Sequence, residues 1–161
     1  MIQQNLDRSN VFNRSWAEYK IGFNDSRGNY WLGNDLLNQL TLTGRYKLRF
    51  DLQSRNNSNW YYAEYSTFIV QPEMSNYRLT VSQYSGNADR DACSYHDGMK
   101  FTTFDRDNGQ QLSSANCAVS YGAGWWHKNC SRCCVNGDYF NWAGLPGGIY
   151  LQSSRMWLQC K

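Results

Sequence analysis

The stretch that decides the fold runs from Asp105 to Gly137 and reads DRDNGQQLSSANCAVSYGAGWWHKNCSRCCVNG. It carries two aspartates two positions apart, four of the six cysteines, adjacent tryptophans and a histidine, with glycines between them. It lacks the period of a helix or of a long strand. Because binding residues are concentrated on loops held by a rigid scaffold, we place the function in this segment.

Length and composition favour one globular domain rich in aromatic side chains. A chain of 161 residues is long enough to bury a sizeable core. Seven Trp and twelve Tyr supply apolar rings with polar tips, which suit buried hydrogen bonds or a recognition surface. The net charge is only +3 and no basic run stands out, so we predict no nucleic-acid partner. No apolar stretch is long enough to predict a membrane span.

The cysteine content favours an oxidising, extracellular compartment. Six cysteines occur in a chain rich in Asn, Ser, Gly and Tyr. The first residues, MIQQNLDRSNVFNRS, lack the apolar core of a signal peptide. Either the signal lies upstream of a truncated product, or the protein is not conventionally secreted. We expect a secreted protein whose signal is not present in this chain.

Hydrophobic periodicity predicts an α+β domain. Short helices are expected over residues 13–23 and, capped by Asn34, over the run DLLNQLTL with an apolar face of Leu36, Leu37 and Leu40. Alternating apolar and polar residues predict an antiparallel meander of three strands, and a last strand is expected near the end. The predicted strands are 45–52, 60–70, 77–83 and 149–158. One domain, 1–161, would thus have a sheet with helices over 1–84 and a loop-rich binding region over 85–161.

Several motifs, in order, resemble a known family. They are WAEYKIGF, GNYWLGNDLLNQLT, YAEYSTFIV, YRLTVSQYSGNA, DGMKFTTFDRDN, NCAVSYGAGWWHKNC and VNGDYF. Together they resemble the fibrinogen C-terminal domain of ficolins, tachylectins, tenascins and angiopoietins. The resemblance implies a twisted antiparallel sheet with a loop-rich ligand and calcium subdomain. It also implies that the chain is truncated at both ends, lacking most of the N-terminal subdomain and the closing strand.

The resemblance implies a ligand pocket beside a disulfide between Cys117 and Cys130. It implies a cis peptide bond between Asn129 and Cys130, and it places Ser131 where binding members have a histidine. An aromatic slot with fixed N–H donors suits an N-acetyl group. The ligand-binding residues predicted on this basis are Tyr121, Trp126, His127, Asn129, Cys130, Ser131 and Tyr139. The alternative is that the two adjacent tryptophans belong to the core.

The same resemblance places Asp105 and Asp107 in a calcium loop. Calcium needs six to eight oxygen ligands, yet Gly109 stands where the family usually has a further carboxylate. Carbonyl ligands would come from about Gln111 and Ser113. A weak Ca²⁺ site and a solvated turn without calcium remain equal alternatives.

The other four cysteines, Cys93, Cys133, Cys134 and Cys160, are additional to the family pattern. Because adjacent cysteines rarely bond to each other, Cys133 and Cys134 should have different partners, and Cys93 and Cys160 are available. A zinc site with His96 or His127 is the rival interpretation. The cysteines lack paired C-x-x-C spacing, so disulfides are favoured.

These features predict a lectin-like recognition module of the innate-immune type that binds acetylated sugars or similar surface groups. The alternative is a receptor or matrix domain that binds protein partners without sugar. Since single-sugar sites are weak, oligomers are expected. We predict no enzymatic activity: Cys130 and His127 superficially suggest a thiol nucleophile and its base, but Cys130 should be oxidised.

Overall fold

A computed structural model describes residues 1–109 and 115–161. Within these ranges the main element is a seven-stranded antiparallel sheet in the order β2-β3-β1-β9-β4-β5-β6, so the predicted α+β class is confirmed. Its strands are β1 (Gln3–Asn5), β2 (Phe23–Asn24), β3 (Tyr30–Trp31), β4 (Tyr46–Ser54), β5 (Trp60–Val70), β6 (Leu79–Gly86) and β9 (Leu151–Cys160). The α-helices are α1 (Trp16–Ile21), α2 (Asn34–Thr41) and α3 (Cys117–Tyr121). Single 3₁₀ turns are η1 (Asn10–Phe12), η2 (Glu73–Ser75) and η3 (Cys93–His96), and β7 (Cys133–Cys134) pairs with β8 (Asn141–Trp142).

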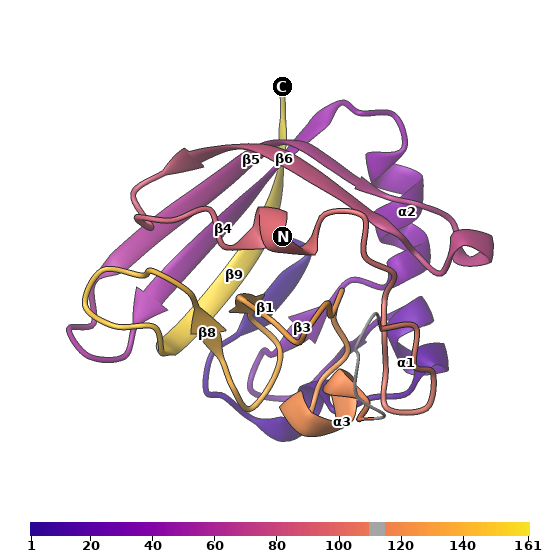
Figure 1. The fold of residues 1–161 in the computed structure, drawn as a ribbon, viewed down its shortest axis with the longest axis horizontal. Coiled ribbons are helices and arrows are strands. Elements are labelled where there is room, and N and C mark those ends of the chain that lie inside the picture. Colours follow the sequence, from indigo (N-terminus) through magenta and orange to yellow (C-terminus); the bar gives the residue numbers. More distant parts are fainter. Residues whose placement is uncertain (110–114) are drawn as a thin grey trace.

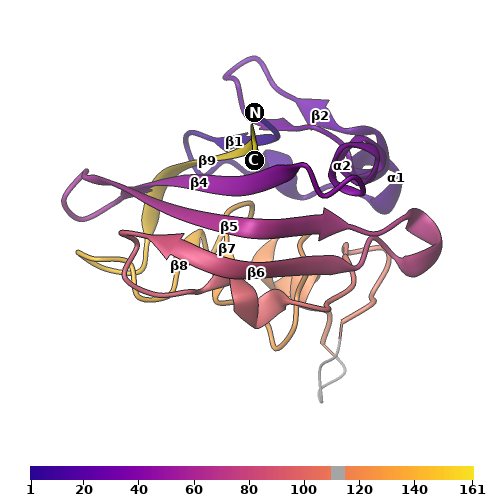
Figure 2. The ribbon, with the colours of Figure 1, turned by 90° about the horizontal axis from the view of Figure 1, so that it is seen from above.

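The predicted meander is present as β4, β5 and β6. Leu48, Phe50 and Leu52 of β4 are buried while their neighbours are half-buried, as the alternation indicated. Phe50 lies opposite Ala63 of β5, and the pairing continues from β5 to β6. Figure 2 shows these three strands side by side, with the loop-rich segment along one side of them.

The last strand corrects one expectation from the resemblance. β9 pairs with β4 on one side and with β1 on the other, with Met156 opposite both Phe50 and Gln3. The predicted strand near residues 149–158 therefore exists, and the prediction that the closing strand is missing is wrong. β9 is the central strand of the sheet, and its inward side chains Ser154 and Met156 are buried.

Local sequence signals explain where the first helix begins and ends. The side chain of Ser15 accepts from the Glu18 backbone N–H, and the Glu18 carboxylate accepts from the Ser15 backbone N–H, so the two residues form a capping box at α1. Gly22 ends α1 at φ 92°, where an added Cβ would lie 2.5 Å from a backbone oxygen of Leu32.

The second helix differs from its prediction in two respects. Gly33 occupies the N-cap position of α2 and makes no side-chain cap. Asn34 lies inside the helix and accepts a hydrogen bond from the Trp31 indole. Leu37 is buried, but Leu36 and Leu40 are 44% and 38% exposed, because only a narrow face of α2 packs inward.

The segment between β6 and β9 lies against the sheet and contains few helices or strands. Figure 1 shows its described residues, coloured from pink through orange to yellow, in front of the sheet, with α1 and α2 together at one side. Beneath it, fully buried rings of Tyr19, Trp31, Phe101 and Trp126 pack at centroid distances of 5.0–6.2 Å. This aromatic core joins α1, β3 and the loop-rich segment. Among the described helices, none has the length and apolar character needed to cross a membrane.

Candidate binding site

The short helix α3 positions the first predicted ligand residue, Tyr121. Asn116 caps the helix, since its side-chain oxygen accepts from the Ala118 backbone N–H at 2.8 Å. Gly122 ends the helix in the left-handed conformation at φ 63°. Tyr121 is therefore at the last turn of α3, where its ring is half-buried.

A disulfide between Cys117 and Cys130 ties α3 to the following loop, as the resemblance implied. The peptide bond between Asn129 and Cys130 is trans, so the cis bond expected there is wrong. The turn closes without it because the Lys128 backbone N–H donates to the Cys130 carbonyl at 2.8 Å. Asn129 is exposed and Cys130 is half-buried.

Three of the predicted residues meet at the surface. The rings of Tyr121 and Tyr139 lie 4.9 Å apart, and Tyr139 is 54% exposed. Gly137 permits this, because an added Cβ would lie 2.2 Å from the Tyr121 carbonyl oxygen. Burial raises the pKa of Tyr121, while a hydrogen bond from the Ser131 backbone N–H opposes that rise. Tyr121, Ser131 and Tyr139 thus form one half-open group, called here the tyrosine slot.

Two further predicted residues lie inside the protein. Trp126 is 1% exposed, and its indole donates to the Tyr77 carbonyl at 2.7 Å. His127 is fully buried beneath the slot, 5.5 Å from the Tyr121 ring, and its Nε2–H donates to the Ala123 carbonyl at 3.0 Å. Burial lowers the pKa of His127 to about 4. His127 therefore lies directly under the slot, whereas Trp126 belongs to the aromatic core with Trp31 and Phe101.

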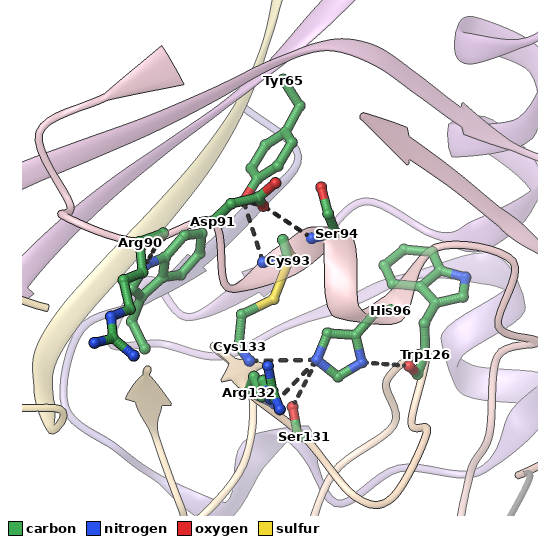
Figure 3. Close-up of a disulfide and its surroundings, with 11 residues drawn as sticks. Tyr65, Arg90, Asp91, Cys93, Ser94, His96, Trp126, Ser131, Arg132 and Cys133 are labelled. Carbon is green, nitrogen blue, oxygen red and sulfur yellow. Dashed lines mark hydrogen bonds between the residues drawn. A yellow bond between two sulfur atoms is a disulfide. The ribbon is translucent and has the colours of Figure 1, made fainter. Parts of the chain in front are cut away.

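The hydrogen bonds of His96 to the binding loop were not anticipated from the sequence, where this residue was considered only as a zinc ligand. His96 is fully buried, and its Nδ1–H donates to the Trp126 carbonyl at 2.8 Å. Its Nε2 accepts from the backbone N–H groups of Arg132 and Cys133 at 3.1 and 3.3 Å, and lies 3.3 Å from the Ser131 hydroxyl oxygen (Figure 3). Burial lowers its pKa to about 3, so the ring stays neutral. No motif signals this role, because it depends on contacts over 30 to 37 positions.

The additional cysteines are only partly paired. Cys93 bonds to Cys133 beside His96 (Figure 3). Cys134 is buried and free, and Cys160 is exposed and free, so the expectation of a second additional disulfide is wrong. The reason is geometric: Cys160 is at the end of β9, opposite Tyr46, whereas Cys134 is in β7. Because Cys93 and Cys133 are bonded to each other, neither thiolate is available as a zinc ligand in this structure.

The two aspartates of the proposed calcium loop make local bonds. Asp105 accepts from the Trp16 backbone N–H at 2.9 Å and from the Thr103 hydroxyl at 2.7 Å, which fastens the start of α1. Asp107 is exposed and accepts from the Gly109 N–H at 2.9 Å. Its carboxylate suits Ca²⁺, but Asp105 is committed to protein donors. The proposed carbonyl ligands at Gln111 and Ser113 lie outside the described residues.

Comparison with known proteins identifies the class. Residues 1–152 match the family described as fibrinogen beta and gamma chains, C-terminal globular domain, and the chain belongs to this family. Fibrinogen-like domains are recognition modules rather than enzymes. The fold agrees: the chain is 34% identical to the fibrinogen-like globe domain of human ANGPTL2, with a TM-score of 0.89, and the match covers 99% of this chain and 78% of that one.

Individual relatives are longer. Fibrinogen-like protein A of Apostichopus parvimensis is 41% identical over 151 residues, covering 91% of this chain and 51% of that protein. Human ficolin-3 is 39% identical, covering 86% and 46%. Mouse tenascin-R is also 39% identical, covering 86% and 10%. A structure of lamprey fibrin D-dimer, complexed with the peptide ligand Gly-His-Arg-Pro-amide, matches with a TM-score of 0.85 at 30% identity, over 98% of this chain and 59% of that one.

Proposed function

We propose that this domain binds acetylated sugars or similar acetylated surface groups at the tyrosine slot. The observation that carries this proposal is the pair of tyrosine rings, 4.9 Å apart, beside the Ser131 backbone N–H. The rings offer an apolar wall for an acetyl methyl group. A phenolic hydroxyl that accepts from a backbone N–H keeps its own proton to donate, and the acetyl carbonyl is a suitable acceptor.

The surroundings favour a preformed site. The Cys117–Cys130 disulfide closes the loop, and His96 bonds to it from the interior. Loops ordered before binding lose less conformational entropy when the ligand arrives. Two disulfides also favour action outside the cell. Because one small slot binds weakly, several copies acting together would supply avidity of the innate-immune type.

Retention on immobilised N-acetylglucosamine, with and without calcium and in competition with free acetate, tests this function. Tyr139→Ala removes one wall of the slot and should weaken retention about tenfold, the equivalent of one lost aromatic contact. Tyr150→Ala is the matched control, since Tyr150 is 47% exposed and Tyr139 54%. Absence of retention in both conditions, or equal losses in the two variants, would overturn acetyl-group binding at this slot.

Recognition of a protein is the second candidate, and one feature favours it. A depression of about 400 Å³ is lined by Asn13, Phe104 and Val119. Phe104 and Val119 are 46% and 62% exposed. Exposed apolar side chains beside a depression are typical of a protein contact. Val119 precedes Tyr121 by two positions on α3, so the two side chains point to different sides of the helix.

A peptide-binding measurement separates the two functions. The probe is Gly-His-Arg-Pro-amide, the ligand of the lamprey fibrin structure. Binding of this peptide that is lost in Val119→Ser, together with no retention on the acetylated resin, would establish the second function. Retention on the resin that survives Val119→Ser, without peptide binding, supports the first.

A further inference from the structure

Two cations converge on one aromatic ring beside the tyrosine slot. The Lys128 ammonium lies 4.9 Å, and the Arg132 guanidinium carbon 4.4 Å, from the ring centroid of Tyr95. Each such contact contributes about 0.5–1 kcal/mol at an exposed site, which is enough to orient a flexible side chain. Both positive charges are thereby held at the same aromatic ring.

Neither cation has an acidic partner. In the described part of the chain, the ion pairs within 4.0 Å involve other lysines and arginines, and the remaining residues, 110–114, read QQLSS and contain no acid. By contrast, Lys47 and Arg49 on the sheet both pair with Glu64. Among the described residues, Lys128 and Arg132 are therefore without an ion-pair partner within 4.0 Å.

The ring that gathers the cations is firmly placed. The Tyr95 hydroxyl donates to the Asn129 carbonyl at 3.2 Å, and the ring packs edge-on against His96 at 5.2 Å. The Cys93–Cys133 disulfide joins η3, which carries Tyr95, to the residue after Arg132. The Cys117–Cys130 bond fixes the loop two residues after Lys128. Two disulfides therefore hold the segments that carry Tyr95, Lys128 and Arg132, a group called here the cationic patch.

The patch adjoins the tyrosine slot. The Cys117–Cys130 disulfide joins α3, which ends at Tyr121, to the loop that carries Lys128 and Arg132. A ligand held in the slot would present its neighbouring substituents to Lys128 and Arg132.

We infer that Lys128 and Arg132, gathered over Tyr95, form a subsite for an anionic substituent, a sulfate or carboxylate carried by an acetylated sugar. This inference rests on the proposed function and narrows its ligand class to acidic glycans. The guanidinium offers paired N–H donors for a planar or tetrahedral oxyanion, and the ammonium adds a point charge. Because Lys128 and Arg132 form no ion pair within 4.0 Å in the part of the chain that the structure describes, an incoming anion does not have to displace a protein carboxylate.

The test compares three soluble probes by isothermal titration at low salt. They are N-acetylglucosamine, its 6-sulfate, and glucose 6-sulfate, which carries the anion without the acetyl group. Wild type should prefer the sulfated acetylated sugar over the neutral one by about tenfold, since two exposed ion pairs are worth about 1.4 kcal/mol in total. The preference should shrink at 1 M salt, where the Debye length falls to about 3 Å.

Charge-removing variants locate the effect. The Lys128→Gln, Arg132→Gln double variant should lose the preference while binding the neutral sugar as wild type does. The matched control is Lys100→Gln with Arg78→Gln, which removes two positive charges from residues without an ion pair in the described chain. Its preference should remain that of wild type, and thermal melts check that every variant is folded.

The outcomes separate the subsite from the slot. Binding of N-acetylglucosamine without preference for its sulfate overturns the anionic subsite and leaves the acetyl slot standing. Binding of both sulfated sugars but not of the neutral one, lost in the Lys128/Arg132 variant, supports the subsite and overturns the acetyl slot. An equal loss of preference in the Lys100/Arg78 control, or no binding of any probe, overturns the subsite.

Discussion

The Nε2 atom of His96 accepts a 3.1 Å hydrogen bond from the backbone N–H of Arg132 and thereby joins the interior of the domain to the binding loop. The same ring donates to the Trp126 carbonyl from its other nitrogen. One neutral imidazole therefore satisfies backbone groups of two segments at once. The position of Arg132 follows from this bond and from the adjacent disulfide at Cys133.

Replacing His96 with Ala should destabilise the domain by about 3 kcal/mol. The change leaves the N–H groups of Arg132 and Cys133 and the Trp126 carbonyl without their present partner, and a buried unsatisfied group costs about 1–3 kcal/mol. Urea unfolding of the oxidised protein measures the effect. Lys100→Ala serves as a surface control, and a loss for His96→Ala no larger than that of the control contradicts the interpretation.

Stability should fall as the pH is lowered from about 6.5. The pKa values of His96 and His127 are lowered from 6.5 to about 3 and about 4, so below pH 6.5 the unfolded chain takes up two protons that the folded protein excludes. The limiting slope is about 2.7 kcal/mol per pH unit for the pair. Urea unfolding at closely spaced pH values between 4.5 and 7.5 measures this slope.

Carboxylates with lowered pKa values contribute little to this slope between pH 6.5 and 4.5. Hydrogen bonds and cations lower the pKa of Glu18, Glu64 and Glu73 from 4.5, so these groups lose their stabilising charge only at more acidic pH. The variant His127→Gln, whose amide can still donate to the Ala123 carbonyl, should show about half the slope. A stability that stays constant between pH 6.5 and 4.5 would refute the burial of both neutral rings.

Thiol titration should find one reactive cysteine in the folded protein and two after unfolding under non-reducing conditions. Cys160 is exposed, whereas Cys134 is buried and its pKa is raised to about 11 by desolvation. Reaction with a chromogenic disulfide reagent at pH 8 counts the accessible thiols. Cys160→Ser should abolish the fast reaction, and a fast reaction that persists in this variant would show that Cys134 is accessible.

The two loop aspartates should respond differently to calcium. Asp105→Ala removes the acceptor at the start of α1 and should cost about 1 kcal/mol with or without calcium. Asp107→Ala should leave the calcium-free melt nearly unchanged and abolish any stabilisation that calcium gives to wild type. Thermal melts with calcium or chelator decide this, and an identical calcium response in wild type and Asp107→Ala removes Asp107 from the site.

The sequence predicted the fold wherever a pattern repeats within one element. Alternation gave β4, where Leu48, Phe50 and Leu52 point inward, and the helical spacing of residues 13–23 gave α1. Strands of two residues, such as β3 and β7, are too short to show a period. The place of β9 between β1 and β4 depends on pairing with residues far away in the sequence, such as Phe50 with Met156, which no local pattern encodes.

The sequence indicated which residues to consider for the candidate site, but not which of them are exposed and which are buried. The resemblance predicted the Cys117–Cys130 bond, which is confirmed, and from the same motif it named Tyr121, whose role in ligand binding stays a prediction. Whether Trp126 lines a pocket or fills the core depends on which distant rings surround it, here including those of Trp31 and Phe101. For the same reason the gathering of Lys128 and Arg132 over Tyr95 is visible only in three dimensions.

The central position of β9 has a consequence for how the chain folds during synthesis. Until its last ten-residue strand is made, the sheet consists of two separate parts, β1–β3 and β4–β6, with open edges at β1 and β4. Such edges are templates for pairing with other chains. Pairing between residues so far apart in sequence is also intrinsically slow. The nascent chain therefore passes through an aggregation-prone stage that ends only when residues 151–160 close the gap.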